Sequence, residues 1–297
     1  MTLSPLRYPG GKSNIAPLIR HILEEKYDSA RNDLTYIEPF AGGAGVAINL
    51  LIEGVVSKVV INDYDKSIYS FWRALKHETD TLIRMIDKTP ITINEWHRQK
   101  SIYLKANNKY SLELGFAAFF LNRTNRSGIL KAGPIGGYGQ NGTYQMDARY
   151  NKDTLIDRIQ KIASHKKALF VYNKEVRCFI SQIIPKYSDN ALVYFDPPYF
   201  AHGKRLYKNF LTYEDHVEIA DHISQHVPCD WVLTYDDAPE IRNIYSAYSY
   251  PSKKYTLNYS AANKGKGIEL IFFKSPELIP TDKNQNYKVK QLSITSW

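Results

Sequence analysis

The chain has 297 residues, of which 39 are Lys or Arg and 30 are Asp or Glu, and its net charge at pH 7 is +9. The chain has two isolated cysteines, Cys178 and Cys229, which argues against a disulfide scaffold and a cysteine-ligated zinc site. It has no apolar stretch as long as a membrane span, which argues against a membrane protein. Residues 1–11 lack the apolar core of a signal peptide, so we expect a cytoplasmic protein.

The positive charge is concentrated in the middle third of the chain. Residues 76–167 contain 16 Lys or Arg and eight Asp or Glu (+8), whereas the remainder contains 23 and 22 (+1). Such localised charge indicates a polyanionic partner. His222 and His226 have the spacing of a helical metal pair, but no further ligand accompanies them, so we expect an exposed helix face and no metal.

The N-terminal region combines a tight glycine turn with a helix start. Residues 6–12 read Leu-Arg-Tyr-Pro-Gly-Gly-Lys, and a helical pattern follows over 14–25. A P-loop is excluded, because Leu6 stands where that motif needs glycine and no strand precedes the turn. Lys12 beside a helix start suits a carboxylate ligand.

A strand, a glycine-rich turn and a helix follow. Residues 35–40 read as a strand, 41–45 as Ala-Gly-Gly-Ala-Gly and 46–53 as a helix, which is the start of a Rossmann-like unit. A second strand over 58–62 ends at Asp63, 18 residues after Gly45, where such folds bind ribose hydroxyls. The glycine pattern is not GxGxxG, which disfavours NAD.

The middle of the chain changes character. Residues 68–110 look helical and polar, whereas residues 114–146 hold no acidic residue and seven of the 16 glycines. The pattern predicts a basic loop region carrying a hairpin. Its Arg and Asn side chains are those that pair with guanine and adenine edges in the major groove.

The α/β pattern resumes after a helix over 152–164. We expect strands over 168–172, 191–195 and 231–235, helices over 175–184, 212–225 and 240–246, and a closing antiparallel pair over 254–260 and 268–274. Asp196-Pro197-Pro198-Tyr199 stops the strand that ends at Phe195. A carboxylate, the Pro197 carbonyl and an aromatic face together form a receptor for a flat molecule that bears an exocyclic amine.

Four motifs in this order resemble the Dam-type (class α) family of site-specific DNA adenine-N6 methyltransferases. They are Pro9-Gly10-Gly11-Lys12, Glu38-Pro39-Phe40-Ala41-Gly42-Gly43, Asn62-Asp63 and Asp196-Pro197-Pro198-Tyr199. The resemblance covers almost the whole chain and includes the basic insert before the last motif. It departs at Tyr8, where tryptophan is common, and at Glu38, where aspartate is common.

The resemblance implies an α/β fold. A Rossmann-like, S-adenosylmethionine (SAM)-dependent methyltransferase sheet would carry an inserted, mainly helical target-recognition domain with a basic hairpin or loop. The catalytic domain would comprise residues 1–75 and 168–297, and the insert residues 76–167. The partners would be SAM and double-stranded DNA, with a cognate restriction endonuclease as a further expected partner. We expect a monomer that is encoded by a bacterium or phage.

The resemblance also assigns site residues. SAM would be held by Tyr8, Lys12, Phe40, Gly42, Gly43, Asp63 and Asp196. Asp196, the Pro197 carbonyl and Tyr199 would bind and activate N6 of an adenine flipped out of the duplex, with Tyr259 as a second apolar wall. DNA would be contacted by Arg123, Asn125 and Arg126, which would read bases, and by Lys131, which would bind phosphate.

Two other interpretations stay open at this point. The substrate could be RNA adenine, or cytosine N4, although Asp196 disfavours the latter because cytosine-N4 enzymes usually carry serine there. The chain could also be a DNA-binding subunit with an inactive methyltransferase fold. Intact Lys12, Asp63, Asp196 and Tyr199 argue against that alternative.

Overall fold

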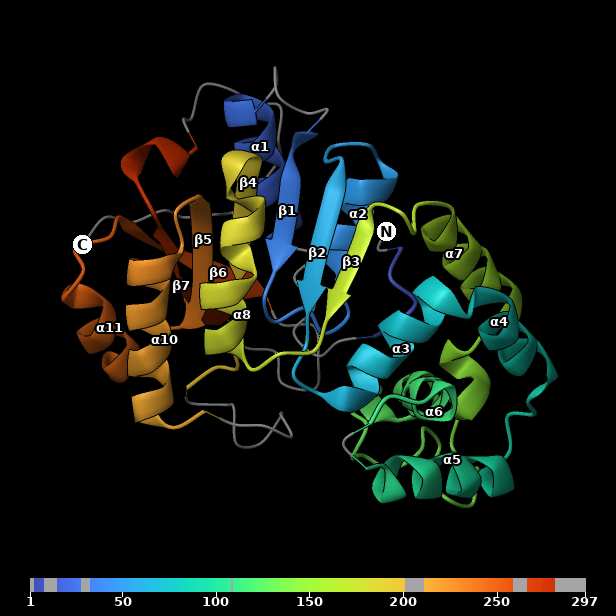
Figure 1. Ribbon diagram of the computed structural model, residues 1–297. Helices are drawn as coiled ribbons and strands as arrows, with labels where there is room; N and C mark the ends of the chain where they lie inside the picture. Colours follow the sequence, from blue (N-terminus) through green and yellow to red (C-terminus); the bar gives the residue numbers. More distant parts are fainter. Residues whose placement is uncertain are drawn as a thin grey trace.

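The computed structural model describes residues 3–7, 15–27, 33–107, 109–200, 211–258 and 266–280. Seven strands in this part of the chain form one sheet in the order β3-β2-β1-β4-β5-β7-β6 (Figure 1). Their bounds are β1 Thr35–Glu38, β2 Lys58–Asn62, β3 Leu169–Tyr172, β4 Ala191–Phe195, β5 Asp230–Asp236, β6 Ser252–Asn258 and β7 Lys266–Phe273.

The direction in which the chain adds strands to the sheet reverses between β1 and β4. Strands β1 to β5 are mutually parallel where they pair, whereas β7 runs antiparallel to both β5 and β6. The chain adds β2 and β3 on one side of β1 and β4 and β5 on the other, so β1 and β4 flank the topological switch point. In open α/β sheets, ligands bind at the carboxyl ends of the strands beside that point.

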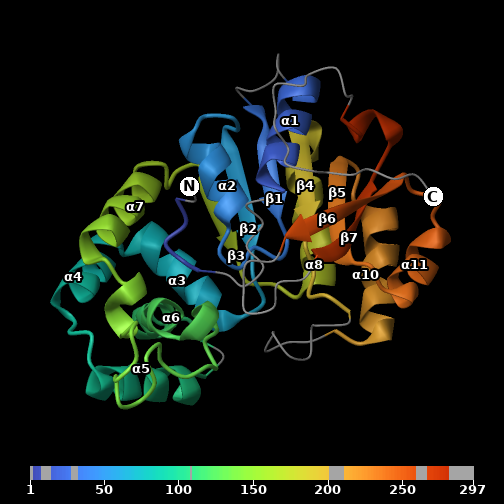
Figure 2. The same ribbon diagram turned by 180° about the vertical axis from the view of Figure 1, so that it is seen from behind.

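Alternate side chains of the central strands pack into two cores. Tyr36, Val59 and Leu192 belong to one, and Ile37 and Val193 to the other, as expected where successive residues of a strand point to opposite faces. Helices α8, α10 and α11 cover the face in Figure 1, and α1 and α2 cover the face in Figure 2. The helices are α1 Ala16–Tyr27, α2 Gly45–Ile52, α3 Lys66–His77, α4 Thr79–Lys88, α5 Ile93–Lys105, α6 Leu112–Thr124, α7 Lys152–Ser164, α8 Val176–Gln182, α10 Tyr213–His226 and α11 Pro239–Ser246.

Helices α3 to α7 form a lobe beyond the β3 edge, with α6 at its centre (Figures 1 and 2). Every residue of α6 from Leu114 to Thr124 is buried, which explains why the part from Leu114 to Leu121 is apolar all round. Phe71 of α3 stacks on Phe119 with ring centroids 5.6 Å apart. A Cβ at Gly115 would lie 2.6 Å from the Ser70 carbonyl oxygen, so the close approach of α3 and α6 requires glycine there.

The predicted α/β fold is confirmed, and the predicted strands and helices match the observed ones closely. The basic segment after α6 differs, because it forms short 3-10 turns at Arg126–Gly128 and Met146–Arg149 and a loop between them instead of a hairpin. In this segment an isolated antiparallel β-bridge joins Asn125 and Pro134. The lobe shares the core of the α1–α2 face, so the division at residues 75/76 and 167/168 stays a proposal.

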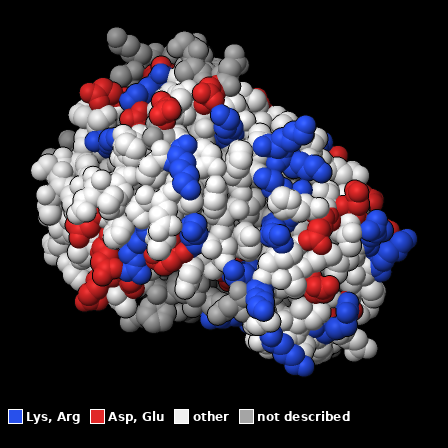
Figure 3. All heavy atoms as spheres, in the orientation of Figure 1, with Lys and Arg blue, Asp and Glu red and all other residues white. Residues whose placement is uncertain are grey.

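Charge is distributed unevenly over the molecule. On the face in Figure 3, Lys and Arg are spread mainly over the side that carries α3 to α7, whereas Asp and Glu gather over α8 and α10. No helix within the described ranges is long and apolar enough to cross a membrane.

Candidate active site

Three of the predicted motifs meet at the carboxyl edge of the sheet. The glycine-rich turn follows β1, Asp63 follows β2, and Asp196 follows β4. Because β1 pairs with both β2 and β4, these motifs lie on adjacent strands at the switch point. The fold therefore brings the cofactor and catalytic candidates together.

Asp63 holds the glycine turn against the end of β2. Its Oδ2 accepts a hydrogen bond from the Gly42 amide at 2.8 Å, and its Oδ1 accepts one from the Asp65 amide at 2.8 Å. Trp72 Nε1 donates to the Gly42 carbonyl at 2.9 Å. Gly42 (φ 48°) and Ala44 (φ 46°) both adopt left-handed backbone, which is strained for alanine and typical of a functional turn.

Burial of the Asp63 carboxyl group and the nearby Asp65 carboxylate raise the pKa of Asp63 to about 7, and the two amide hydrogen bonds oppose the shift. Each carboxylate oxygen keeps lone pairs beyond the one amide bond that it accepts. Asp63 is therefore a pre-oriented acceptor for hydroxyl groups, and its charge changes near neutral pH.

Glu38, the last residue of β1, is a second perturbed carboxyl group. The Ala47 amide in the first turn of α2 donates to its Oε1 at 3.1 Å. Burial raises the pKa of Glu38 to about 8; the Tyr36 hydroxyl and the Ala47 amide oppose the shift, and the Asp196 charge adds to it. At neutral pH Glu38 thus favours its protonated form and adds little negative charge beside Asp196.

Asp196 is oriented by hydroxyl groups from two strands. Thr234 Oγ1 of β5 donates to Asp196 Oδ1 at 3.1 Å and lies 2.8 Å from the Tyr194 hydroxyl. Threonine has one hydroxyl hydrogen, so Tyr194 must donate to Thr234, and the bonds run from Tyr194 through Thr234 to Asp196. The sequence did not indicate Thr234, which looks like any residue of a buried strand.

Tyr199 is fixed by an acidic residue of β7. The Tyr199 and Tyr255 hydroxyls both donate to Glu269, which is buried. Burial, followed by the Asp196 and Glu269 charges, raises the pKa of Tyr199 well above its ordinary value, so this hydroxyl stays protonated. Glu269 was missed, although a carboxylate within the apolar run from Ile268 to Phe273 is a sequence signal for such a role.

The segments on either side of residues 201–210 are tied to the fold. The Phe200 amide, next to Tyr199, donates to Asp236 Oδ1 at 3.0 Å. Thr212 caps α10, and its side chain and that of Asp215 form a reciprocal capping box. Residues 201–210 lie outside the described residues.

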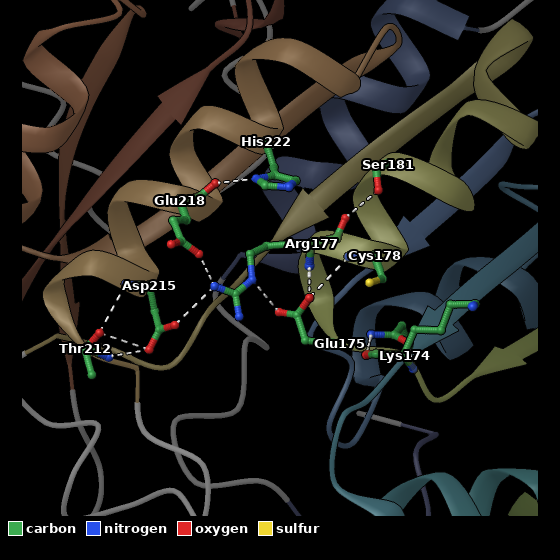
Figure 4. Close-up of polar contacts among 10 residues, drawn as sticks. Lys174, Glu175, Arg177, Cys178, Ser181, Thr212, Asp215, Glu218 and His222 are labelled. Atoms are coloured by element: carbon green, nitrogen blue, oxygen red, sulfur yellow. Dashed lines mark hydrogen bonds and ion pairs between the residues drawn. The ribbon is translucent and has the colours of Figure 1, made fainter.

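Arg177 links α8 to the first turns of α10 (Figure 4). Its guanidinium contacts Glu175 at 2.9 Å, Asp215 at 3.3 Å and also Glu218. All four side chains are partly exposed, so each pair stabilises the fold only modestly. Together they connect the helix after β3 to α10, the helix that follows the Asp196-Pro197-Pro198-Tyr199 motif.

Two of the four predicted DNA-contacting residues are buried. Arg123 donates through Nε to the Pro5 carbonyl at 2.6 Å and is 7% exposed. Asn125 is fully buried and accepts from Trp96 Nε1 at 2.7 Å, while its Nδ2 donates to the Ile129 and Leu130 carbonyls. Both side chains hold the lobe together, so we withdraw them as base-reading residues.

The other two, Arg126 and Lys131, are exposed on the loop after α6. The Arg126 amide bonds to the Gly133 carbonyl, which fixes the backbone and leaves the side chain outside. These residues stay candidates for DNA contact. The burial pattern could not be predicted, because the sequence places all four residues in one polar stretch.

Tyr8, Lys12 and Tyr259 lie outside the described residues, but the chain just before Tyr8 is well fixed. The Asn122 side chain accepts from the Arg7 amide and donates to the Arg7 carbonyl, both at 2.6 Å. The start of the predicted cofactor motif is therefore attached to α6. No cluster of three or more possible metal ligands occurs in the part of the chain that the structure describes.

Comparisons with known proteins agree with this geometry. The family model for the D12 class N6 adenine-specific DNA methyltransferases matches residues 8–259. The chain is similar to Type II methyltransferase M.MjaIII of Methanocaldococcus jannaschii (28% identical over 206 residues, 65% of this chain and 68% of that protein). It is also similar to Type II methyltransferase M1.LlaDCHI of Lactococcus lactis subsp. cremoris (23% over 292 residues, 89% and 93%). Among solved structures, the chain is similar to the rRNA methyltransferase AviRa of Streptomyces viridochromogenes, with a TM-score of 0.34 and 12% sequence identity. That similarity covers 87% of this chain and 85% of the other.

Proposed function

The chain belongs to the D12 class of N6 adenine-specific DNA methyltransferases, and from this premise we propose that it methylates N6 of a flipped-out adenine within a short specific sequence of double-stranded DNA, with SAM as the donor. Family membership favours adenine over cytosine, and DNA over RNA. The observation that supports this proposal most is the pair of restraints on Asp196 and Tyr199, which keep the carboxylate and the aromatic ring oriented at the switch point.

The cofactor site fits SAM at the residues that the structure describes. Asp63 presents acceptor oxygens of the kind that ribose hydroxyls need, next to a glycine turn whose backbone a ligand can approach closely. Phe40, Gly42 and Gly43 would line the site, with Tyr8 and Lys12 beyond the described part. When bound, SAM supplies an electrophilic methyl group.

The chain's own residues would bind and orient the target base. Adenine N6 is a weak nucleophile, because its lone pair is delocalised into the ring. Hydrogen bonds from N6 to Asp196 and to the Pro197 carbonyl would favour a pyramidal nitrogen and direct its lone pair. The Tyr199 ring would stack on the base and offset part of the few kcal/mol that flipping costs. Positioning and electrostatics would thus supply most of the acceleration.

Methyl transfer from labelled SAM to unmethylated genomic DNA tests the proposal, with modified bases mapped by sequencing. We expect N6-methyladenine in one short motif and no product from Asp196→Ala. Asp80→Ala, which removes an exposed carboxylate of α4, serves as the control and should keep full activity. Methylation of another base, or an active Asp196→Ala enzyme, would contradict the mechanism. A cognate endonuclease, a monomeric state and a cytoplasmic location are further proposals.

A further inference from the structure

A basic pocket lies at the start of α7. Its volume is about 630 Å³. Four basic side chains line it, Arg123, Arg149, Lys152 and Arg158, against one acidic side chain, Asp147. The lining therefore carries a formal charge of +3.

Arg123 brings unused hydrogen-bond donors to this pocket. A guanidinium has five N–H donors. Only the Nε donor of Arg123 is engaged by another described residue, the Pro5 carbonyl, although the side chain is 93% buried (7% exposed). Burial and the neighbouring Arg158 and Arg7 cations lower the pKa of Arg123 to about 9, so it remains charged at neutral pH in a crowded cationic environment.

The arginines around the pocket are not paired with carboxylates in the described part of the chain. None of Arg7, Arg123, Arg149 and Arg158 forms an ion pair with Asp or Glu there. By contrast, Arg177 of α8 contacts three carboxylates (Figure 4). Arg123 is buried, and a buried charge is normally paired, so its guanidinium together with the neighbouring basic side chains offers a site for an anion.

Two other features of the pocket suit an anion. The N-terminus of α7 opens onto it, with Asn151 and Thr154 among the lining residues, and helix N-termini favour negative charge. The Tyr150 hydroxyl is buried near Arg123 and has no hydrogen-bond partner in the described structure. Each feature alone would be weak, but both lie beside the unpaired arginines.

We propose that this pocket binds a phosphate group, and that the phosphate belongs to the backbone of the DNA substrate. A second cavity of about 310 Å³ shares Asp147 and Lys152 with it and extends to Gln140 and Gln145 of the acid-free loop. The two cavities therefore join the pocket to the loop that carries the DNA-contact candidates. The assignment to DNA rests on the proposed function, whereas the anion site does not. A backbone contact there would position the duplex without reading its sequence.

The test compares the double variant Arg149→Ala/Arg158→Ala with Arg84→Ala/Arg98→Ala. The control removes the same charge from exposed positions on α4 and α5. Thermal unfolding is measured in inorganic phosphate and in chloride at equal ionic strength, without SAM or DNA. Duplex DNA binding is then measured against salt concentration. Circular dichroism verifies that all the variants are folded.

We expect phosphate to raise the unfolding temperature of the wild type and the control but not of the pocket variant. The slope of log affinity against log salt should fall by about one in the pocket variant, since each phosphate contact contributes about 0.9. An undiminished phosphate effect in the pocket variant would overturn the site. Loss of the phosphate effect with an unchanged salt slope would support the site and overturn the DNA assignment, leaving a small phosphate-bearing ligand. Neither readout depends on methyl transfer.

Discussion

Replacing Thr234 by valine should show how much the orientation of the Asp196 carboxylate contributes to activity, because the carboxylate itself is kept. Valine keeps the shape of threonine but removes the donor to Asp196 Oδ1 and the acceptor for the Tyr194 hydroxyl. A hydrogen bond to a charged group contributes about 1.5–3 kcal/mol. If about half of the upper value acts only in the transition state, kcat falls roughly tenfold, because about 1.4 kcal/mol corresponds to a factor of ten. The buried Tyr194 hydroxyl, left without a partner, should lower the free energy of unfolding by about 1–3 kcal/mol.

Steady-state methylation kinetics and thermal unfolding of three variants test this reasoning. Thr234→Ser keeps the hydroxyl and should retain nearly wild-type kcat. Tyr194→Phe removes the first hydroxyl of the series but leaves Thr234 bonded to Asp196, so it should change kcat by less than about threefold, well under the roughly tenfold cost of a lost charged hydrogen bond. A folded Thr234→Val enzyme with wild-type kcat would refute the role of Thr234, as would a Tyr194→Phe enzyme that is equally impaired.

Three further predictions follow from the structure. Because the pKa of Asp63 is raised to about 7, its carboxyl group ionises as the pH rises from 6 to 8. SAM affinity measured by calorimetry should therefore increase over that range, and the Asp63→Asn variant should not show this pH dependence. Gly115→Ala places a Cβ 2.6 Å from a backbone oxygen of α3 and should destabilise the protein by about 1–3 kcal/mol in denaturant unfolding, whereas Gly139→Ala in the exposed loop should cost little. Arg126→Ala should relax sequence preference in a randomised-site methylation assay, and a preference profile identical to that of the wild type would contradict a base-reading role for Arg126. Lys131→Ala should weaken DNA binding equally for all sequences and reduce the slope of log affinity against log salt by about one.

The order of elements and the main motifs could be predicted because their signals are local. Two prolines stop the strand at Asp196, glycines form the turn after β1, and apolar runs of two to five residues mark the buried parallel strands. The basic segment was harder to interpret. Its glycines and polar residues are compatible with a hairpin or a loop, and the choice depends on packing against α5 and α6.

The sequence by itself determined where the strands end and therefore which residues reach the carboxyl edge, because chain stiffness and hydrophobic periodicity act between near neighbours. Only the tertiary structure decided which side chains form hydrogen bonds to the residues at that edge. Thr234 reaches Asp196 from 38 residues away, and Glu269 reaches Tyr199 from 70. Likewise, Arg123 and Asn125 look like their neighbour Arg126 in sequence, but helix packing buries the first two and exposes the third. Burial and hydrogen-bond partnership depend on the path of the whole chain, so residues of the same type in one segment can take opposite roles.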